Sequence, residues 1–391
     1  MKVVVLGGAG LTGRCAVRDL AESCDVSEIV IADVNLAKAR EIADEIKRGN
    51  VSATYVDLRK PKDAADVLKG ADVALNAAQY YCNLEAMEAA LLAKVHYLDQ
   101  GGLHYMTLKQ WELHDRFKEA ELTALLCMGN CVGISNVMAR YAADKLDSVE
   151  TIQVRDGWVD FTKGVPPFYV TWSISTLLDE FLLDAIIFEN GEFKKIPPLS
   201  RREIVHFPEP VGKQEVYSTI HSEITTFPTT FRDKGIKNVN WMEGGPGFLE
   251  IKVLVDAGFG SDEPVDIDGT KVSPRNFLVK LLASRDLLGY PDDVVPDDWE
   301  AARVQVTGLK AGRKVTHMVD WISHSKKEWR ANAGEYLVGV PSSIAVQMIG
   351  KGEIKERGVI LPENSVDPKR FITELTRRGI ALKETTSTDI G

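Results

Sequence analysis

The chain of 391 residues is long enough for two domains, each with its own hydrophobic core. Its residues are 45% hydrophobic and 27% charged, which is typical of a globular protein and excludes a chain that is disordered throughout. The formal net charge of -10, with no dense cluster of Lys and Arg, excludes nucleic acid as an expected partner and favours a small molecule.

The cysteine content and the N-terminal residues indicate a cytoplasmic protein. The five cysteines form no C-x-x-C pair, and a chain of this size does not need disulfides, so we expect reduced thiols. The apolar run in MKVVVLGGAG is too short for a signal peptide and predicts a strand. No window approaches the length of an apolar membrane span, so we expect no membrane partner.

From residue 3 to about 128, short apolar runs alternate with segments of helical periodicity. The runs lack the in-and-out alternation of a half-exposed sheet, which predicts parallel strands that are covered on both faces. Repeated strand, helix and strand predict an α/β fold, a Rossmann-type doubly wound parallel sheet. The predicted strands are Val3–Leu6, Ile29–Ala32, Thr54–Val56, Val73–Ala77, Val95–Leu98 and Ala124–Cys127.

After residue 130, strand-like runs follow one another with few helices between them. This order predicts a second, α+β domain with a mixed or antiparallel sheet and helices on one side. Its predicted strands are Thr151–Val159, Glu215–Thr225, Glu250–Val255, Ala302–Thr307 and Val315–Trp321, and its predicted helices lie near Ser173–Phe188 and Pro274–Leu288.

The C-terminal part predicts helices again, at Pro341–Ile349 and Pro368–Arg378, and we expect them to cover the first domain. We therefore assign residues 1–130 and 338–391 to a dinucleotide-binding domain, and residues 131–337 to a domain for substrate binding and dimerisation. The Pro-rich segments IPPLS, HFPEPVG and GYPDDVVPDD predict surface loops.

The strongest motif is VVVLGGAGLTG, in which Gly8, Gly10 and Gly13 form G-x-G-x-x-G between a strand and a helix. These glycines allow a tight turn, a close approach of a pyrophosphate and close packing of helix on strand. Leu11 and Thr12 begin the helix, whose N-terminal amides attract a phosphate. The alternative is a glycine-rich turn without a ligand, which the next feature makes less favourable.

That feature is Asp33, which ends the second strand about twenty residues after the last glycine, where a carboxylate binds the ribose hydroxyls of NAD. Capping of the next helix is a second role that is compatible with this one. We expect NAD rather than NADP, because no Arg follows Asp33 to bind a 2′-phosphate and Val34 stands there instead.

Two further strand ends complete the predicted cofactor site. Asp57 closes the third strand, where it would neighbour the adenine, or be an exposed loop carboxylate. Ala77 and Ala78 follow the fourth strand at the same edge of the sheet, and their small side chains would let the nicotinamide ribose come close.

The chain resembles a known family over nearly its whole length. The segments that carry the resemblance are GGAGLTG, ADVN (32–35), NAAQYYCN (76–83), HYLDQGG (96–102), GNCVGISN (129–136), VRDGWV (154–159), WSISTLLDEF (172–181), TIHSEITTFP (219–228) and GVILPENSVDPKRFITELTRRGI (358–380). Their order is similar to that of the saccharopine dehydrogenase family, and closest to its lysine 6-dehydrogenase-like members.

The resemblance implies oxidation or reduction, dependent on a pyridine nucleotide, at a carbon that bears an amine. It also implies a homodimer built through the sheet of the second domain, an amino acid as substrate and no metal. By resemblance, the substrate site lies where Tyr80, Asp99, Asn136 and His221 converge.

This chain departs from the saccharopine reductases of the family at two places. Cys131 and Val132 stand where those enzymes tend to carry Asp-Pro, and Asp156, Gly157 and Trp158 stand where they tend to carry Gly-Gly-Leu. Lysine or a related diamino acid therefore fits at least as well as saccharopine.

Three residues are candidates for proton transfer. Asp99 lies just past a predicted strand and would be the base, or a turn residue. His221 and Glu223 lie two apart on a predicted strand, hence on one face, which would pair an imidazole with a carboxylate. A structural hydrogen bond is the alternative role for this pair.

Other polar residues have a structural interpretation. Arg155 and Asp156 would form an ion pair or bind substrate, and Cys131 lacks an adjacent base that would make it a nucleophile. Lys252 and Arg232 are candidates to bind a carboxylate, with surface charge as the default.

The sequence thus predicts an NAD(P)-dependent oxidoreductase that acts on a C–N bond, of the lysine 6-dehydrogenase or saccharopine dehydrogenase type. One alternative is an enzyme like carboxynorspermidine or homospermidine synthase, for which the pocket should be lined by carboxylates matched to a polyamine. The other is a non-catalytic sensor that binds NAD.

Overall fold

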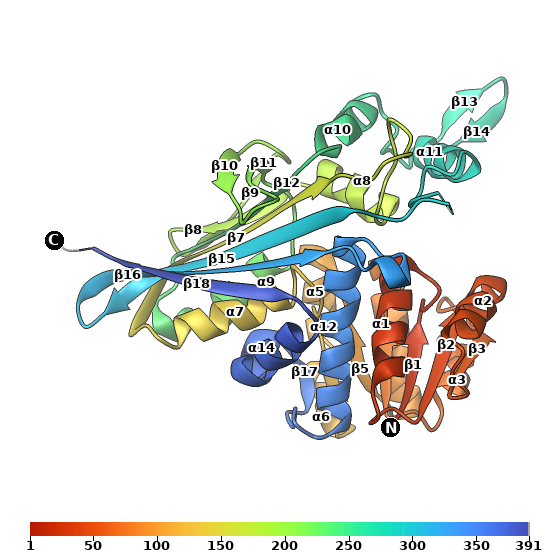
Figure 1. Cartoon of the computed structure of the whole chain (residues 1–391), viewed down its shortest axis with the longest axis horizontal. Coiled ribbons are helices and arrows are strands. Elements are labelled where there is room, and N and C mark those ends of the chain that lie inside the picture. The colour runs from red at the N-terminus through yellow and green to blue at the C-terminus, as the bar shows by residue number, and fades with distance from the viewer. Residues whose placement is uncertain (292, 390–391) are drawn as a thin grey trace.

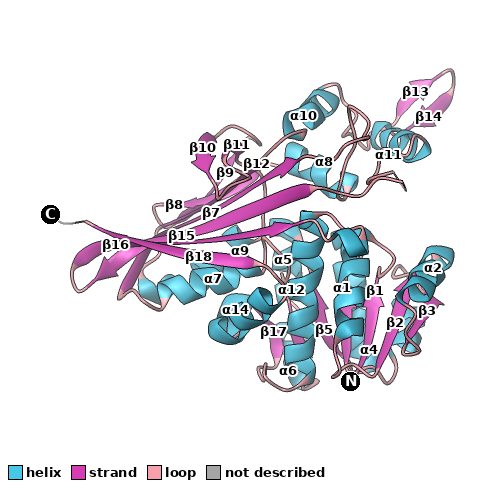
Figure 2. Cartoon of the chain, viewed as in Figure 1, coloured by secondary structure: helices cyan, strands magenta, loops and turns pink. Residues whose placement is uncertain are grey.

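The computed structural model describes residues 1–291 and 293–389, which form two large sheets (Figures 1 and 2). The first sheet has the order β17-β6-β5-β4-β1-β2-β3, and every neighbouring pair is parallel. Its strands are β1 (Lys2–Leu6), β2 (Glu28–Asp33), β3 (Val51–Tyr55), β4 (Val73–Asn76), β5 (His96–Asp99), β6 (Thr123–Leu125) and β17 (Gly358–Ile360). The predicted doubly wound sheet is confirmed, and its order reverses between β1 and β4, where such sheets bind ligands.

Both faces of this sheet are buried, which explains the unbroken apolar runs of its strands. Val3 and Val5 of β1 pack in one hydrophobic cluster, and Val4 and Leu6 pack in another on the opposite face. The helices between the strands are α1 (Leu11–Glu22), α2 (Leu36–Ile46), α3 (Pro61–Leu68), α4 (Asn83–Ala93), α5 (Leu103–Trp111) and α6 (His114–Glu119), and the 3-10 turn η1 (Tyr80–Cys82) precedes α4.

The second sheet is mixed, as predicted. Its order is β10-β11-β12-β7-β15-β16-β18, with β8 pairing β12 and β9 at one side. The pair β12 and β7 is parallel and the other pairs are antiparallel. The strands are β7 (Ser148–Asp160), β8 (Ala185–Glu189), β9 (Glu192–Ile196), β10 (Arg202–His206), β11 (Lys213–Tyr217), β12 (Asn238–Gly244), β15 (Asp298–Lys310), β16 (Arg313–His324) and β18 (Ala381–Thr388).

The helices of this part correct three predictions. They are α7 (Ile134–Ala143), α8 (Ile174–Leu182), α9 (Glu223–Thr230), η2 (Arg232–Lys234), α10 (Phe248–Asp256) and α11 (Pro274–Ser284), and a small hairpin, β13 (Val265–Ile267) and β14 (Thr270–Val272), precedes α11. The predicted strand Glu250–Val255 is wrong: the segment lies in α10, because Phe248 and Ile251, three residues apart, bury one helical face.

The other two corrections concern element ends. The predicted strand Glu215–Thr225 ends at Tyr217, and α9 begins at Glu223. The helix predicted near Ser173–Phe188 ends at Leu182, and its apolar C-terminal part is the buried strand β8. A short apolar run of this kind fits a buried strand and a buried helix equally well, so periodicity does not separate them.

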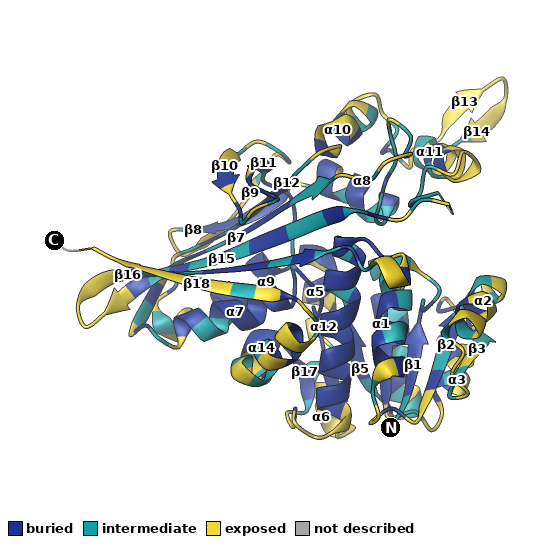
Figure 3. Ribbon diagram, in the orientation of Figure 1, coloured by how far each residue is buried: buried dark blue, intermediate teal, exposed yellow. Residues whose placement is uncertain are grey.

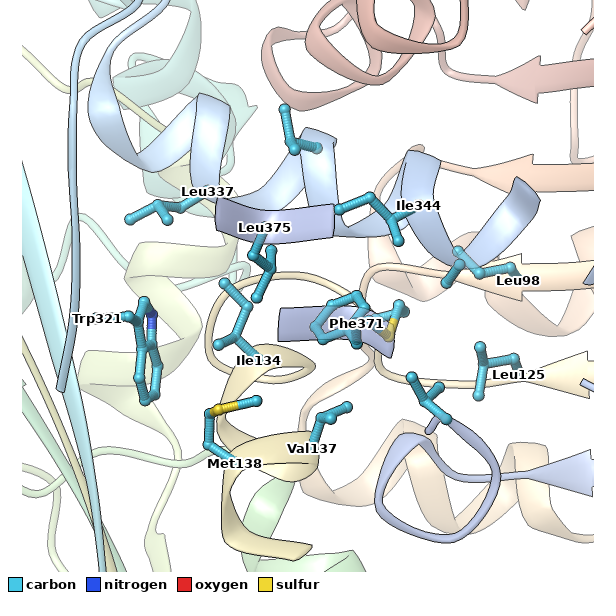
Figure 4. Packing of buried hydrophobic residues seen from close by; sticks show 14 of the residues in the cluster. Leu98, Leu125, Ile134, Val137, Met138, Trp321, Leu337, Ile344, Phe371 and Leu375 are labelled. Carbon is cyan, nitrogen blue, oxygen red and sulfur yellow. The ribbon is translucent and has the colours of Figure 1, made fainter. Parts of the chain in front are cut away.

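The C-terminal residues join the two sheets. They form η3 (Lys327–Trp329), α12 (Ala333–Gly350), α13 (Pro362–Ser365) and α14 (Pro368–Arg377), followed by β18. Helix α12 is buried along nearly all its length (Figure 3) and lies so close to α1 that a Cβ on Gly339 would approach Cys15 Cβ to 2.6 Å. Figure 4 shows Leu337 and Ile344 of α12 packed with Phe371 of α14 in one core.

The C-terminal strands divide between the sheets. Strand β17 extends the first sheet and β18 lies beside β16 in the second, although residues 381–391 are assigned above to the first domain. The exact domain boundaries stay a prediction, and residues 390 and 391 lie outside the described part.

Of the predicted Pro-rich loops, IPPLS and HFPEPVG connect strands, and the described residues of GYPDDVVPDD lie after α11 and lead into β15. Phe207 and Val211 of HFPEPVG are buried beneath the turn between β10 and β11 rather than on the surface. In GYPDDVVPDD, Asp292 lies outside the described residues. Among the residues that are described, no helix has the length and apolar character of a membrane span.

Candidate active site

The glycine loop leaves no room for side chains between β1, α1 and the end of β4. Gly7 has φ +71°, and a Cβ there would lie 2.7 Å from Ala78 Cα. A Cβ on Gly13 would lie 2.5 Å from Gly7 O. Helix α1 begins after Gly10, which makes no side-chain cap, so the amides of the first turn are left for an anion. This geometry fits the pyrophosphate of a dinucleotide.

The two residues that start α1 differ in their contacts. Leu11 and Thr12 are partly exposed. Thr12 Oγ1 donates a hydrogen bond of 2.6 Å to Gln100 Oε1, and Gln100 Nε2 donates to Ser342 Oγ at 3.2 Å. The loop is thereby fastened to β5 and to α12.

Asp33 lies directly beside the glycine loop. Its Oδ2 accepts from Ala9 N at 3.1 Å, and its Oδ1 accepts from Asn35 N at 2.8 Å. Each oxygen keeps a lone pair for a ribose hydroxyl. Val34, the next residue, is 60% exposed. Asp33 therefore fits the ribose of a nicotinamide dinucleotide, which supplies hydride chemistry when it is bound.

The other predicted cofactor residues lie along the same edge. Asp57 accepts from Arg59 Nε and Nη2, both at 2.8 Å, and these hydrogen bonds hold the pKa of Asp57 below its usual value. Ala77 N donates to Leu6 O at 2.8 Å, which sets Ala77 and Ala78 against the glycine loop. The adenine contact of Asp57 stays a prediction.

The burial of Asp99 and Asn136 argues against direct contact of these side chains with a substrate. Both are fully buried and hydrogen-bonded to protein groups. Asp99 accepts from Gly101 N (3.0 Å), Cys127 N (2.8 Å) and Gln110 Nε2 (2.6 Å). Burial raises the pKa of Asp99 against these hydrogen bonds. Asn136 Nδ2 donates to Glu363 Oε2 at 2.8 Å, and Asn136 Oδ1 accepts from Gly133 N at 2.9 Å. Both residues hold the ends of β5 and of the turn before α7 in place.

His221 and Glu223 do meet, although not on a strand. His221 lies in the loop after β11, and Glu223 is the first residue of α9. His221 Nδ1 is hydrogen-bonded to Glu223 Oε2, Ser135 Oγ donates to Glu223 Oε1 at 2.7 Å, and the imidazole stacks on Trp241 with ring centroids 4.0 Å apart. Burial lowers the pKa of His221, but the charges of Glu223 and Glu243 outweigh it and raise the pKa overall.

Beside this pair, one face of the second sheet carries acidic side chains in register. Asp156 of β7 pairs with Glu243 of β12, and Trp158 of β7 pairs with Glu300 of β15. Side chains two apart on a strand point to one face and paired residues share a face, so all four lie together. Toward the start of β7 the same face is apolar and packs in the core.

Glu180 of α8 adds a fourth carboxylate to this group. Asp156 Oδ1 and Glu180 Oε2 are buried without a hydrogen-bond partner among the described residues. Burial, followed by the charges of neighbouring acids, raises the pKa of Asp156 and of Glu180 well above the usual values, and raises the pKa of Glu300 to about 7. We call Asp156, Glu180, Glu243 and Glu300 the carboxylate cluster.

The carboxylate cluster faces the carboxyl ends of the first sheet. Asn130, in the turn after β6, donates through Nδ2 to Glu300 Oε1 and accepts from Trp321 Nε1 at 2.6 Å. In Figure 1 the arrowhead of β1 points toward the second sheet. Cys131 follows Asn130, and burial together with the charge of Asp156 raises the pKa of its thiol, so it is no activated nucleophile.

Tyr80 connects the end of β4 to the second part of the chain. Its Oη donates to Asp179 Oδ2 at 2.8 Å, and Asp179 Oδ1 accepts from Arg275 Nη2. Next to it, Gln79 Oε1 accepts from Ser173 Oγ at 2.9 Å. Burial and Asp179 raise the pKa of Tyr80, so the phenol stays protonated.

Three members of the cluster were not predicted from the sequence, whereas Lys252 has the surface position that was its default interpretation. These are Glu180, Glu243 and Glu300. Glu300 stands two residues before Ala302, the buried first residue of a predicted strand, and the observed strand β15 begins earlier, at Asp298, so that both residues share a face. Lys252 forms an exposed ion pair with Asp256 at 2.6 Å rather than facing the site. Across residues 1–291 and 293–389, no three His, Cys, Asp or Glu side chains are grouped closely enough to hold one metal ion.

The comparisons with known proteins agree with this architecture. The family model "Saccharopine dehydrogenase NADP binding domain" matches residues 3–125, and "Saccharopine dehydrogenase C-terminal domain" matches residues 129–380. The chain belongs to the saccharopine dehydrogenase family. Family members are oxidoreductases acting on amine-related substrates, and the first domain binds a nicotinamide cofactor.

Two curated relatives and one solved structure are similar over almost the whole chain. Carboxynorspermidine synthase of Vibrio cholerae is 30% identical over 95% of this chain and 94% of its own. Carboxyaminopropylagmatine dehydrogenase of Synechocystis is 26% identical over 98% of both. Apo saccharopine dehydrogenase (L-Glu forming) of Saccharomyces cerevisiae is 18% identical, with a TM-score of 0.75 and 99% of each chain covered, and shows the same fold. The narrower likeness to lysine 6-dehydrogenase stays a prediction.

Proposed function

We propose that this member of the family is an NAD(P)-dependent oxidoreductase that forms or splits the secondary amine of a carboxylated polyamine. The carboxylate cluster is the observation that carries this proposal. Grouped carboxylates suit the ammonium groups of a polyamine, and both curated relatives are named for carboxylated amines. Lysine, with its α-ammonium and its side-chain ammonium, has one basic nitrogen fewer than a carboxylated triamine and would match fewer of these carboxylates.

The charge of the cluster argues for a cationic ligand. Asp156 and Glu180 each have a buried oxygen with no partner in the described residues, and leaving such a group unpaired costs about 1–3 kcal/mol. Ammonium groups of a polyamine would donate to these oxygens and offset the repulsion among the acids. The same negative potential would stabilise the cation that forms at the reacting nitrogen.

In the direction of oxidation, the proposed reaction splits the secondary amine with one nicotinamide and one water. The secondary ammonium first loses a proton, which frees the nitrogen lone pair. A bound nicotinamide would accept a hydride from the carbon beside this nitrogen, and the lone pair would form a C=N bond with positive charge. Water adds to that carbon and releases a proton, and the C–N bond then breaks to give a primary amine and an aldehyde. Reduction runs through the same steps in reverse.

His221 is our candidate for the group that moves the proton. Its side chain is 12% exposed, its Nδ1 is held by Glu223, and Nε2 is left to exchange a proton with water or amine. Glu223 orients the imidazole and stabilises its charged form. Asp99, which is fully buried, has a positioning role in this proposal.

For the cofactor we propose a preference for NAD over NADP. Asp33 supports it, since a carboxylate at the ribose repels a 2′-phosphate.

The experiment is a substrate panel read at the absorbance of the reduced nicotinamide. Carboxynorspermidine, norspermidine, saccharopine and lysine are each offered with NAD and with NADP. We expect turnover of carboxynorspermidine well above that of lysine and saccharopine. Turnover of lysine or saccharopine above that of carboxynorspermidine would restore the amino-acid hypothesis, and binding of NADH without turnover of any compound would favour the sensor.

A further inference from the structure

The carboxylate cluster explains how cationic groups are bound but leaves the carboxylate of the proposed substrate unmatched. From the surroundings of Tyr80 we infer that Arg275 of α11 binds this carboxylate and makes the enzyme select carboxylated over uncarboxylated polyamines. This inference rests on the proposed function and names a specificity-determining residue for it.

Arg275 lies where a substrate would extend away from the cofactor. Ala78 is packed against the glycine loop, and two residues later Tyr80 reaches Asp179, which binds Arg275. The charge of Arg275 acts on both Tyr80 and Tyr81. The guanidinium thus stands beside the segment that follows the predicted nicotinamide site.

The guanidinium has donors to spare. Arg275 Nε donates to Gly260 O at 3.0 Å, Nη2 donates to Asp179 Oδ1, and Asp262 lies 3.8 Å from Nε. A guanidinium has five N–H donors, and the described residues provide no hydrogen-bond acceptor for Nη1. The side chain is only 15% exposed, so its position is fixed by the acceptors that it already has. Asp179 orients the fork, and Nη1 is left for a second carboxylate.

Helix α8 connects this cation to the carboxylate cluster through two consecutive residues, Asp179 and Glu180. Asp179 and Glu180 are consecutive, so their side chains diverge by about 100° around the helix. Asp179 faces Tyr80 and Arg275, whereas the charge of Glu243 acts on Glu180. A ligand with a carboxylate at one end and ammonium groups along the rest matches this distribution of charge, and a plain polyamine does not.

A structural brace is the competing role for Arg275, because it links α11 to α8. Two variants separate the roles. Arg275→Met removes the cation, and Asp179→Asn removes the ion pair but keeps the cation. The readouts are kcat/KM for carboxynorspermidine and for norspermidine, which differ only in the carboxyl group, and the ratio between them.

We expect Arg275→Met to lower kcat/KM for carboxynorspermidine about 100-fold and to change kcat/KM for norspermidine less than about threefold. Arg275→Lys should restore part of the ratio between the two kcat/KM values. Asp179→Asn should keep the preference for the carboxylated compound. If both variants lower kcat/KM for the two substrates by the same factor, Arg275 is a structural brace and the inference is wrong.

A binding measurement distinguishes failure of the proposed reaction from failure of the carboxylate site. If the wild-type protein oxidises neither compound, their binding is measured by calorimetry in the presence of NAD. The carboxylate site would be upheld without the reaction if the wild-type protein binds carboxynorspermidine more tightly than norspermidine and Arg275→Met abolishes this difference. Equal binding of both compounds to wild type and variant would overturn it.

Discussion

Glu243 of β12 is paired in register with Asp156 of β7, so that two carboxylates stand side by side on one buried face of the second sheet. Like charges directly opposite each other on a sheet are destabilising. Glu300 and Glu180 add to the repulsion, since their charges and that of Glu243 influence one another. A protein that keeps such an arrangement exchanges stability for a function, as active sites commonly do.

Asp156→Asn should therefore raise stability and lower activity. Burial and neighbouring acids raise the pKa of Asp156, which means that ionisation of Asp156 costs stability, and asparagine cannot ionise. The melting temperature is therefore expected to rise by a few degrees. The lost ammonium contact should raise KM for the amine about tenfold, which corresponds to 1.4 kcal/mol. Thermal unfolding and steady-state kinetics measure the two effects. Glu150→Gln, an exposed acid near the start of the same strand, is the control and should change neither. A destabilised Asp156→Asn would count against a repulsive cluster.

Binding of a polyamine should release protons near neutral pH. Burial raises the pKa of Glu300 to about 7, so this carboxyl is partly protonated in the free protein, and a bound ammonium favours its charged form. Affinity for the amine should then increase as the pH rises through about 7. Calorimetry in buffers of different ionisation enthalpy counts the protons, and Glu300→Gln should reduce the count. Equal proton release by variant and wild type would exclude Glu300 as the source.

The protein should lose stability as the pH rises toward about 8, because of Asp298. Burial raises the pKa of this carboxyl from 3.8 to about 8, although Ala333 N donates to it. A raised pKa means that the folded state holds the proton more tightly than the unfolded chain does. The resulting stabilisation is complete below about pH 3.8 and is lost as the pH rises to about 8. A single group contributes at most about 1.4 kcal/mol per pH unit. Urea unfolding at several pH values should show this slope, and Asp298→Asn should flatten it.

Glu223→Gln should shift the pH profile of oxidation to lower pH. The negative charge of Glu223 helps to raise the pKa of His221, and the neutral amide removes that influence while it keeps an acceptor for Ser135. Neutral imidazole accepts the proton, so activity falls as the pH drops below the pKa of His221. The midpoint of kcat against pH is the measurement. An unchanged midpoint would remove His221 from the proton path.

Asp33→Asn should shift the cofactor preference toward NADP. The amide keeps an acceptor for Ala9 N but no longer repels a 2′-phosphate. We expect the ratio of kcat/KM for NADP over NAD to rise about tenfold, which is the effect of 1.4 kcal/mol. Asp63→Asn, an exposed acid in α3, is the matched control. A wild-type enzyme that already prefers NADP would contradict the role given to Asp33.

The sequence by itself determined the first sheet and its cofactor loop. Unbroken apolar strands such as Val3–Leu6, followed by glycines and a helix, are local patterns, and local patterns suffice where each strand is buried on both faces. The mixed second sheet was also predicted, but the apolar runs at Glu250–Val255 and in Ser173–Phe188 were misassigned in whole or in part, because short apolar runs suit helix and strand alike.

Only the tertiary structure decided which polar residues share the site. Asp99 ends β5 and Asn136 lies in the first turn of α7, both near the carboxyl edge of the first sheet, yet both side chains are fully buried and hydrogen-bonded to protein groups. Asp156, Glu243 and Glu300 lie on three strands far apart in the chain, and strand pairing and register, which no local pattern encodes, bring their charges together. The charge that a ligand would meet depends on this sum, so it becomes apparent only after the chain has folded.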